Sequence, residues 1–334
     1  MTLARWIGGA VRGIIGPLDT VLRTRTRLCA LARQDRSDES VCKDVRFPGA
    51  NATGGRSMIL QEQDDQLLVI RQTDHALLAG FFASAWGNEQ FARPELVDSF
   101  CLAVREHDNG WNEWELAPAI DPKTRLPYSF MSIPTEQHVE VYRRGIERVV
   151  KADPYAGLLV SLHCAGLYDH ARATMPGYSA KYVKSKEQQM VNDFLQELKL
   201  QQLRLKIGLR GNPDTKKLAE ETSMERNARL LEVLDRLSLY FCLNSTDNVT
   251  IEGVPQNNEG GEVDWQLRNC GDSAFSLEPY PFRKEPLGFS ILARRVPRRL
   301  YGDEVDFQRT VDKAPFFALN FTLRAGGATQ SAVA

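Results

Sequence analysis

Five side chains of the kinds that bind metal ions lie in or beside strongly apolar segments of this chain: His75, His107, Asp108, His163 and Asp235. The sequence contains only 5 histidines, and one of them, His107, stands directly before Asp108 in the stretch REHDNGWNEWE. Imidazole nitrogens combined with carboxylate oxygens suit Fe, Mn, Ni or Zn. These five residues are therefore candidate ligands of a divalent ion of one of these elements, which would be the cofactor.

Four expected helices would carry these side chains toward the protein interior. His75 follows a capping position in QTDHALLAGFFASAW, and His107 extends a 3-to-4 spacing of apolar residues. His163 lies in the middle of DPYAGLLVSLHCAGLYDH, which is apolar on every side, and Asp235 lies on an apolar stripe of MERNARLLEVLDRLSLYFCLN. A single buried histidine is most often a satisfied core residue. Four inward polar groups, each costing on the order of several kcal/mol if left alone, favour a shared ion or a mutual network.

The order His75, then His107-Asp108, then Asp235 resembles the H…HD…D signature of the HD-domain superfamily of metal-dependent phosphohydrolases. This resemblance implies that the four residues are metal ligands. His163 matches the extra histidine of the dinuclear members, which include the di-iron inositol oxygenases.

A complete dinuclear set in those enzymes has one more histidine, and this chain offers poor candidates for it. His138 stands near an expected helix start beside Glu136 and Gln137, where we expect it to be solvated. His170 lies seven residues beyond His163, about 10 Å further along a straight helix. The resemblance therefore supports one metal ion better than two.

A second resemblance covers most of the chain, roughly residues 57 to 324. The stretches QTDHALLAGFFASAW, REHDNGWNEWE and DPYAGLLVSLHCAGLY are similar to an uncharacterised family, domain of unknown function family 3891. It implies a single conserved type of domain and no particular activity.

The expected fold class is α+β, a helical bundle of the HD-domain type with an antiparallel sheet formed mainly by C-terminal strands. Residues 57–325 would form one domain, in which 57–245 contain a hairpin and the metal-site helices and 246–325 are rich in strands. Residues 1–56 are expected to be a poorly ordered or targeting leader with a polar linker, and 326–334 a disordered tail.

Apolar periodicity outlines the elements of this domain. The segment 58–70 predicts a β-hairpin that is a candidate to join the sheet. Helices are expected after Pro94, over 135–152, over 153–170 and over 180–206, with a long functional loop over 109–133. Alternating runs after Asn244, the last of them FFALNFTLRAG, predict the late strands.

Composition limits the classes of partner and compartment. A formal net charge of -1 gives no reason to expect nucleic acid, and no segment reaches the ~18 apolar residues of a membrane span. The 6 cysteines are scattered and without a C-x-x-C pair, which favours a reducing, cytoplasmic location. The Arg-rich N-terminus could instead be a mitochondrial presequence. We expect a small-molecule substrate, and the oligomeric state stays open.

Three functions are compatible with these residues. The first is a metal-dependent hydrolase acting on a small phosphorylated substrate, with Asp108 and His163 in catalytic roles. The second is an iron-dependent oxygenase resembling inositol oxygenase, and the third is a non-catalytic binding or scaffold protein whose His and Asp residues form a buried network.

Charged residues near the candidate ligands in sequence could either assist the site or be ordinary surface groups. Four carboxylates could orient the imidazoles or equally serve as surface and capping groups: Asp74, Glu106, Glu113 and Glu115. Four cations could contact phosphate or equally form a solvated face: Arg71, Arg105, Arg172 and Lys181.

Overall fold

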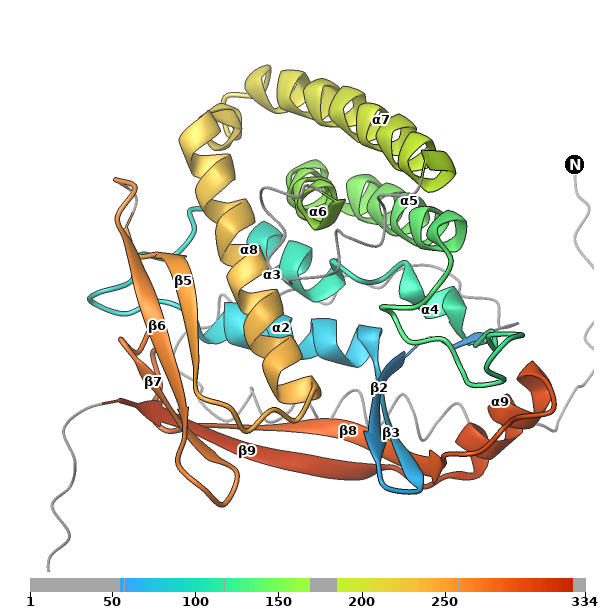
Figure 1. Cartoon of the computed structure of the whole chain (residues 1–334). Coiled ribbons are helices and arrows are strands. Elements are labelled where there is room, and N and C mark those ends of the chain that lie inside the picture. The colour runs from blue at the N-terminus through green and yellow to red at the C-terminus, as the bar shows by residue number, and fades with distance from the viewer. Residues whose placement is uncertain (1–54, 57, 117, 169–184, 258, 327–334) are drawn as a thin grey trace, which may run out of the picture. The chain divides into compact units, whose positions relative to one another are not determined.

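A computed structural model describes residues 55–56, 58–116, 118–168, 185–257 and 259–326 (Figure 1). Residues 1–54 of the expected leader and linker (1–56) and residues 327–334 of the expected tail (326–334) lie outside this range. So do His170, Arg172 and Lys181.

Helices form over the segments with apolar residues at 3-to-4 spacing. The helix after Pro94 begins only at Val97, and the expected loop over 109–133 contains a short helix and a short strand. The helices are α2 (Gln72–Ala85), α3 (Val97–Glu106), α4 (Trp111–Trp114), α5 (Thr135–Ala152), α6 (Pro154–Tyr168), α7 (Ser185–Arg210), α8 (Glu221–Cys242) and α9 (Glu304–Lys313), with the 3-10 helix η2 (Lys216–Ala219).

The strands form one large sheet and one small one. The large sheet has seven strands in the order β2-β3-β8-β9-β7-β6-β5, and β1 pairs with β4 in a separate two-stranded sheet. The strands are β1 (Gly55–Arg56), β2 (Met58–Gln63), β3 (Gln66–Arg71), β4 (Glu115–Leu116), β5 (Val249–Pro255), β6 (Glu262–Asn269), β7 (Ala274–Glu278), β8 (Leu287–Pro297) and β9 (Phe317–Ala325).

The expected architecture, a helical bundle with an antiparallel C-terminal sheet, is wrong. The structure is a mixed α/β fold whose seven-stranded sheet curls beneath the helices (Figure 1). The sheet is mixed because β9 lies between β8 and β7 and runs parallel to β7. The early hairpin belongs to the same sheet, since β3 pairs with β8. Both pairings join segments that are distant in sequence, and the alternation of apolar residues along a strand does not reveal its neighbours.

Helices α2 and α8 pack directly on the sheet, and α3 and α6 lie on the other side of them (Figure 1). Aromatic rings fill the layer between helices and sheet: Phe82 of α2 and Phe241 of α8 both contact Phe289 of β8. Because α2 and α6 are covered on several sides, their apolar residues surround the helix instead of forming a stripe. A polar side chain on these helices therefore enters a dry interior.

From its composition the chain was expected to have no membrane-spanning segment, and the described helices bear on this point. None of them is long and apolar enough to cross a membrane.

Candidate metal centre

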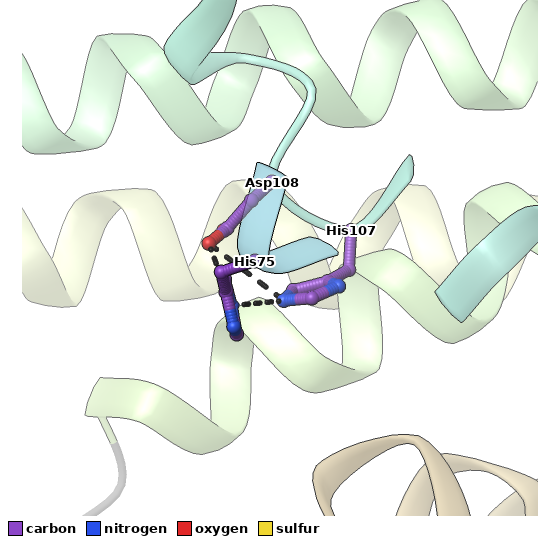
Figure 2. A group of neighbouring side chains, drawn as sticks. All are labelled: His75, His107 and Asp108. Atoms are coloured by element: carbon purple, nitrogen blue, oxygen red, sulfur yellow. Dashed lines mark hydrogen bonds and ion pairs between the residues drawn. The ribbon is translucent and has the colours of Figure 1, made fainter. Parts of the chain in front are cut away.

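Four of the five expected ligands converge at one point. His75 of α2, His107 and Asp108 at the end of α3, and Asp235 of α8 are each at least 90% buried. The Nε2 atom of His75 lies 3.1 Å from His107 Nε2, 3.4 Å from Asp108 Oδ2 and 3.1 Å from Asp235 Oδ1. The Nε2 atom of His107 lies 3.7 Å from Asp108 Oδ2 and 3.4 Å from Asp235 Oδ1. Figure 2 shows His75, His107 and Asp108 pointing toward one another.

These separations match those of neighbouring ligands on a single ion. With metal–ligand distances of about 2.1 Å and angles of about 90° to 110°, adjacent ligand atoms lie about 3.0 to 3.4 Å apart. Four of the five separations above, 3.1 to 3.4 Å, lie in this range, and the fifth, 3.7 Å between His107 Nε2 and Asp108 Oδ2, is slightly longer. The residues present therefore fit a metal ion bound by two imidazole nitrogens and two carboxylate oxygens.

The hydrogen bonds that fix the imidazole tautomers also favour a bound cation. Nδ1 of His107 lies 2.7 Å from the carbonyl oxygen of Val104, to which only an N–H can donate. The Ser238 hydroxyl donates to the carbonyl oxygen of Asp235 and accepts from His75 Nδ1 at 2.7 Å. A neutral ring with its proton on Nδ1 presents a lone pair at Nε2. Two such lone pairs 3.1 Å apart repel each other unless a cation lies between them.

A proton on His75 is the alternative source of positive charge. Burial lowers the pKa of His75, but hydrogen bonds to Asp108 and Asp235 outweigh it and raise the pKa well above its usual value. Burial raises the pKa of Asp235, but hydrogen bonds from the two imidazoles hold it well below its usual value. The two carboxylates are thus ionised, and either a divalent ion or a protonated histidine can balance them.

His163 lies at the edge of this cluster. Its Nε2 is 4.0 Å from Asp235 Oδ2, and it forms a second group of potential ligands with His107 and Asp235. Burial lowers the pKa of His163 to about 4, so its ring is neutral at pH 7. Its Nδ1 atom is buried and has no hydrogen-bond partner among the residues that the structure describes. An unpaired polar atom at such depth is uncommon and suggests a ligand or water that completes it.

The expectation that His138 is solvated is wrong, because its side chain is fully buried. Its ring contacts Trp111 and Tyr142, and its Nδ1 is hydrogen-bonded to the Tyr168 hydroxyl. The position near a helix start was misleading because the segment 109–114 covers that end of α5. His138 is absent from the groups of potential metal ligands found among the described residues.

The four nearby carboxylates all have partners other than the ligand imidazoles. Glu106 pairs with Arg105, and Glu113 pairs with Arg144 and Arg148. Asp74 accepts two hydrogen bonds from Arg71, and Glu115 accepts two from Thr73. The groups that orient the imidazoles are instead the Val104 carbonyl and Ser238. The only sequence signal for Ser238 was its position three residues after Asp235.

The two described cations proposed for phosphate binding are also engaged. Arg71 forms its ion pair with Asp74 at 2.5 Å, and Arg105 forms one with Glu106 at 3.1 Å. Among the described residues, the fully buried polar groups include no lysine or arginine.

Residues 109 and 110 hold the His107-Asp108 pair against α5. The amide of Asn109 donates to the Gly145 carbonyl at 3.2 Å, and Arg148 donates to both the backbone and side-chain oxygens of Asn109. Gly110 approaches α5 so closely that an added Cβ would lie 2.0 Å from the carbonyl oxygen of Val141. The segment that follows α3 is thus packed closely against α5 at Gly110.

Glu115 gives the site a pH-dependent support, because it holds the first turn of α2, the helix that carries His75. Burial raises the pKa of Glu115 to about 8, although Arg71 and Thr73 partly offset the effect. Unfolded chains release this proton near pH 4.5, whereas the folded protein keeps it until about pH 8. The contribution of Glu115 to the free energy of unfolding is therefore complete below pH 4.5 and is lost as the pH rises toward 8.

Glu115→Gln should remove this pH dependence, because glutamine stays neutral and can still bond Thr73. Between pH 5 and 8 the unfolding free energy of the natural protein should fall relative to the variant by up to about 1.4 kcal/mol per pH unit. Guanidinium unfolding of both proteins at several pH values measures the difference. Parallel curves over this range would contradict the prediction.

Fold and site together define a class: a mixed α/β protein with two buried groups that could hold a metal ion, His75-His107-Asp108 and His107-His163-Asp235. The chain belongs to the family described as Protein of unknown function (DUF3891), whose model matches residues 58–298. The matched range includes all five residues of the candidate site. No curated protein and no solved structure matches the chain significantly.

Proposed function

We propose that this protein is a metal-dependent hydrolase acting on a small phosphorylated substrate, with one divalent ion held by His75, His107, Asp108 and Asp235. The observation that carries the proposal is the set of ligand-atom separations of 3.1 to 3.7 Å among buried groups. The H…HD…D order of these residues supports the hydrolase class. When bound, such an ion polarises a phosphoryl oxygen and lowers the pKa of bound water.

In this proposal each side chain of the site has a distinct role. Asp108 and Asp235 supply two negative charges that retain a divalent ion, and Ser238 and Val104 keep the imidazole lone pairs directed at it. His163 is neutral and has an unpartnered Nδ1, so it can accept a proton from the attacking water or hydrogen-bond the substrate. Burial of all these groups excludes bulk water and strengthens their interactions.

The grouping of His163 with His107 and Asp235 favours a second candidate, an iron-dependent oxygenase. Its ligands would be shared between two ions. This candidate predicts two irons per chain and consumption of oxygen.

Elemental analysis of the purified protein tests the proposal, beside a folded His107→Ala, Asp108→Ala double variant. Asp98→Asn is the matched control, because Asp98 is an exposed carboxylate on the same helix α3. We expect near-stoichiometric Fe, Mn, Ni or Zn in the natural protein and the control, and none in the double variant. A screen of phosphate esters with the metal-loaded protein should then give hydrolysis that the double variant lacks.

Other outcomes separate the candidates. Two irons per chain with oxygen uptake would favour the oxygenase. An intact protein that takes up no metal even after titration would rule out both enzymes and favour a buried polar network in which His75 carries a proton.

A further inference from the structure

The two oxygens of the Asp108 carboxylate face different partners. Its Oδ2 lies 3.4 Å from His75 Nε2 and 3.7 Å from His107 Nε2. Its Oδ1 accepts a hydrogen bond of 3.0 Å from the hydroxyl of Tyr142, which lies on α5. One oxygen thus faces the cluster while the other is bound by a neighbouring helix.

The Tyr142 hydroxyl is held firmly in this position. Its ring is 5% exposed and makes edge contacts with His138 and Trp111, at centroid distances of 4.8 and 6.3 Å. Gly145, one turn further along α5, lets the backbone of residues 109 and 110 approach this helix. The same face of α5 therefore contacts the backbone after Asp108 and binds the Asp108 carboxylate.

The two ligand imidazoles each have a supporting contact of their own. His107 donates to the Val104 carbonyl, and His75 donates to Ser238. Mutation cannot remove a backbone carbonyl, and Ser238 lies on the same helix as Asp235. Tyr142 lies on a helix that supplies none of the proposed ligands, so its contribution can be isolated.

We propose that Tyr142 is a positioning residue for the metal centre: it occupies Asp108 Oδ1, so that Asp108 offers only Oδ2 to the ion. This inference rests on the proposed function. A carboxylate that binds through one oxygen leaves an additional coordination position for water or substrate. Supporting groups of this kind typically contribute 10- to 100-fold to metal affinity.

Cobalt titration of the metal-free protein tests the role of Tyr142, because the visible absorption of bound Co²⁺ reports the number and geometry of its ligands. We expect Tyr142→Phe to bind Co²⁺ about 10- to 100-fold more weakly than the natural protein. Its spectrum should also change, since Asp108 becomes free to use both oxygens. Tyr155→Phe is the matched control: Tyr155 is equally buried, and its hydroxyl accepts from Asn227 at 2.7 Å.

Tyr142→Leu removes the same donor with different packing and should show both changes, so a folding defect of one variant does not decide the test. Unchanged affinity and spectrum in a folded Tyr142 variant would overturn the positioning role while leaving the metal site intact. The same changes in Tyr155→Phe would also overturn it, because loss of any buried hydroxyl would then suffice. Failure of the natural protein to bind Co²⁺ would instead overturn the proposed function, and this inference with it.

Discussion

Adding the correct divalent ion to the metal-stripped protein is expected to raise its melting temperature by about 8 to 16 °C. An ion that binds only the folded state stabilises it by about 4 kcal/mol when its concentration is about 1,000 times the Kd. Each kcal/mol shifts the melting temperature of a domain of this size by about 2 to 4 °C. The effect should be large because the ion replaces a repulsive contact between two imidazole lone pairs and balances two buried carboxylates.

Differential scanning calorimetry with Fe²⁺, Mn²⁺, Ni²⁺ and Zn²⁺ measures this shift, before and after a chelator. The His107→Ala, Asp108→Ala double variant should show almost no shift, and Asp98→Asn should keep all of it. A melting temperature that is insensitive to every ion would indicate that a protonated His75 already satisfies the cluster. An equal shift in the double variant would place the binding elsewhere.

Replacing Gly110 with alanine is expected to destabilise the protein by at least about 3 kcal/mol, beyond the usual 1 to 3 kcal/mol of an overpacked site. The new Cβ would lie 2.0 Å from the Val141 carbonyl oxygen and 2.9 Å from its carbon. These atoms belong to the backbone of α5, so no side chain can rotate away. The φ angle of Gly110 is an ordinary -64°, so close approach and not a special backbone conformation requires glycine here.

Because Gly110 is two residues from Asp108, the displaced segment should also move the carboxylate and lower metal content. Gly208→Ala is the opposite control, since a Cβ at Gly208 meets nothing within 4 Å on the exposed side of α7. It should stabilise the protein by up to about 1 kcal/mol through helix propensity. Guanidinium unfolding compares the three proteins, and equal stability of Gly110→Ala and the natural chain would contradict the packing described.

The residues that converge at the site were accessible from the sequence because the signal is local. His75, His107, His163 and Asp235 each lie among apolar residues at helical spacing, and burial of such positions follows from helix periodicity alone. We inferred that they converge because burying a polar group without a partner costs free energy. The structure brings Asp108 and Asp235 each within 3.7 Å of both His75 and His107, and leaves His163 slightly further away.

The contacts that orient the ligand side chains could not be predicted from the sequence in the same way. His138 was expected in solvent but is buried, because the segment 109–114 folds over the start of α5. The charged residues nearest in sequence turned out to have partners other than the ligand side chains, while Ser238 and Tyr142 bind the ligand side chains from other helices. A hydroxyl on a helix gives no sign in the sequence of which carboxylate it will meet.

By itself the sequence determined most of the long helices and strands and the burial of His75, His107, His163 and Asp235, because these follow from residue types at short spacing. Only the tertiary structure decided that β9 lies between β7 and β8, that the early hairpin joins the same curled sheet, and that α5 presents Tyr142 to Asp108. Those pairings depend on the summed packing of segments far apart in the chain, which no local pattern encodes.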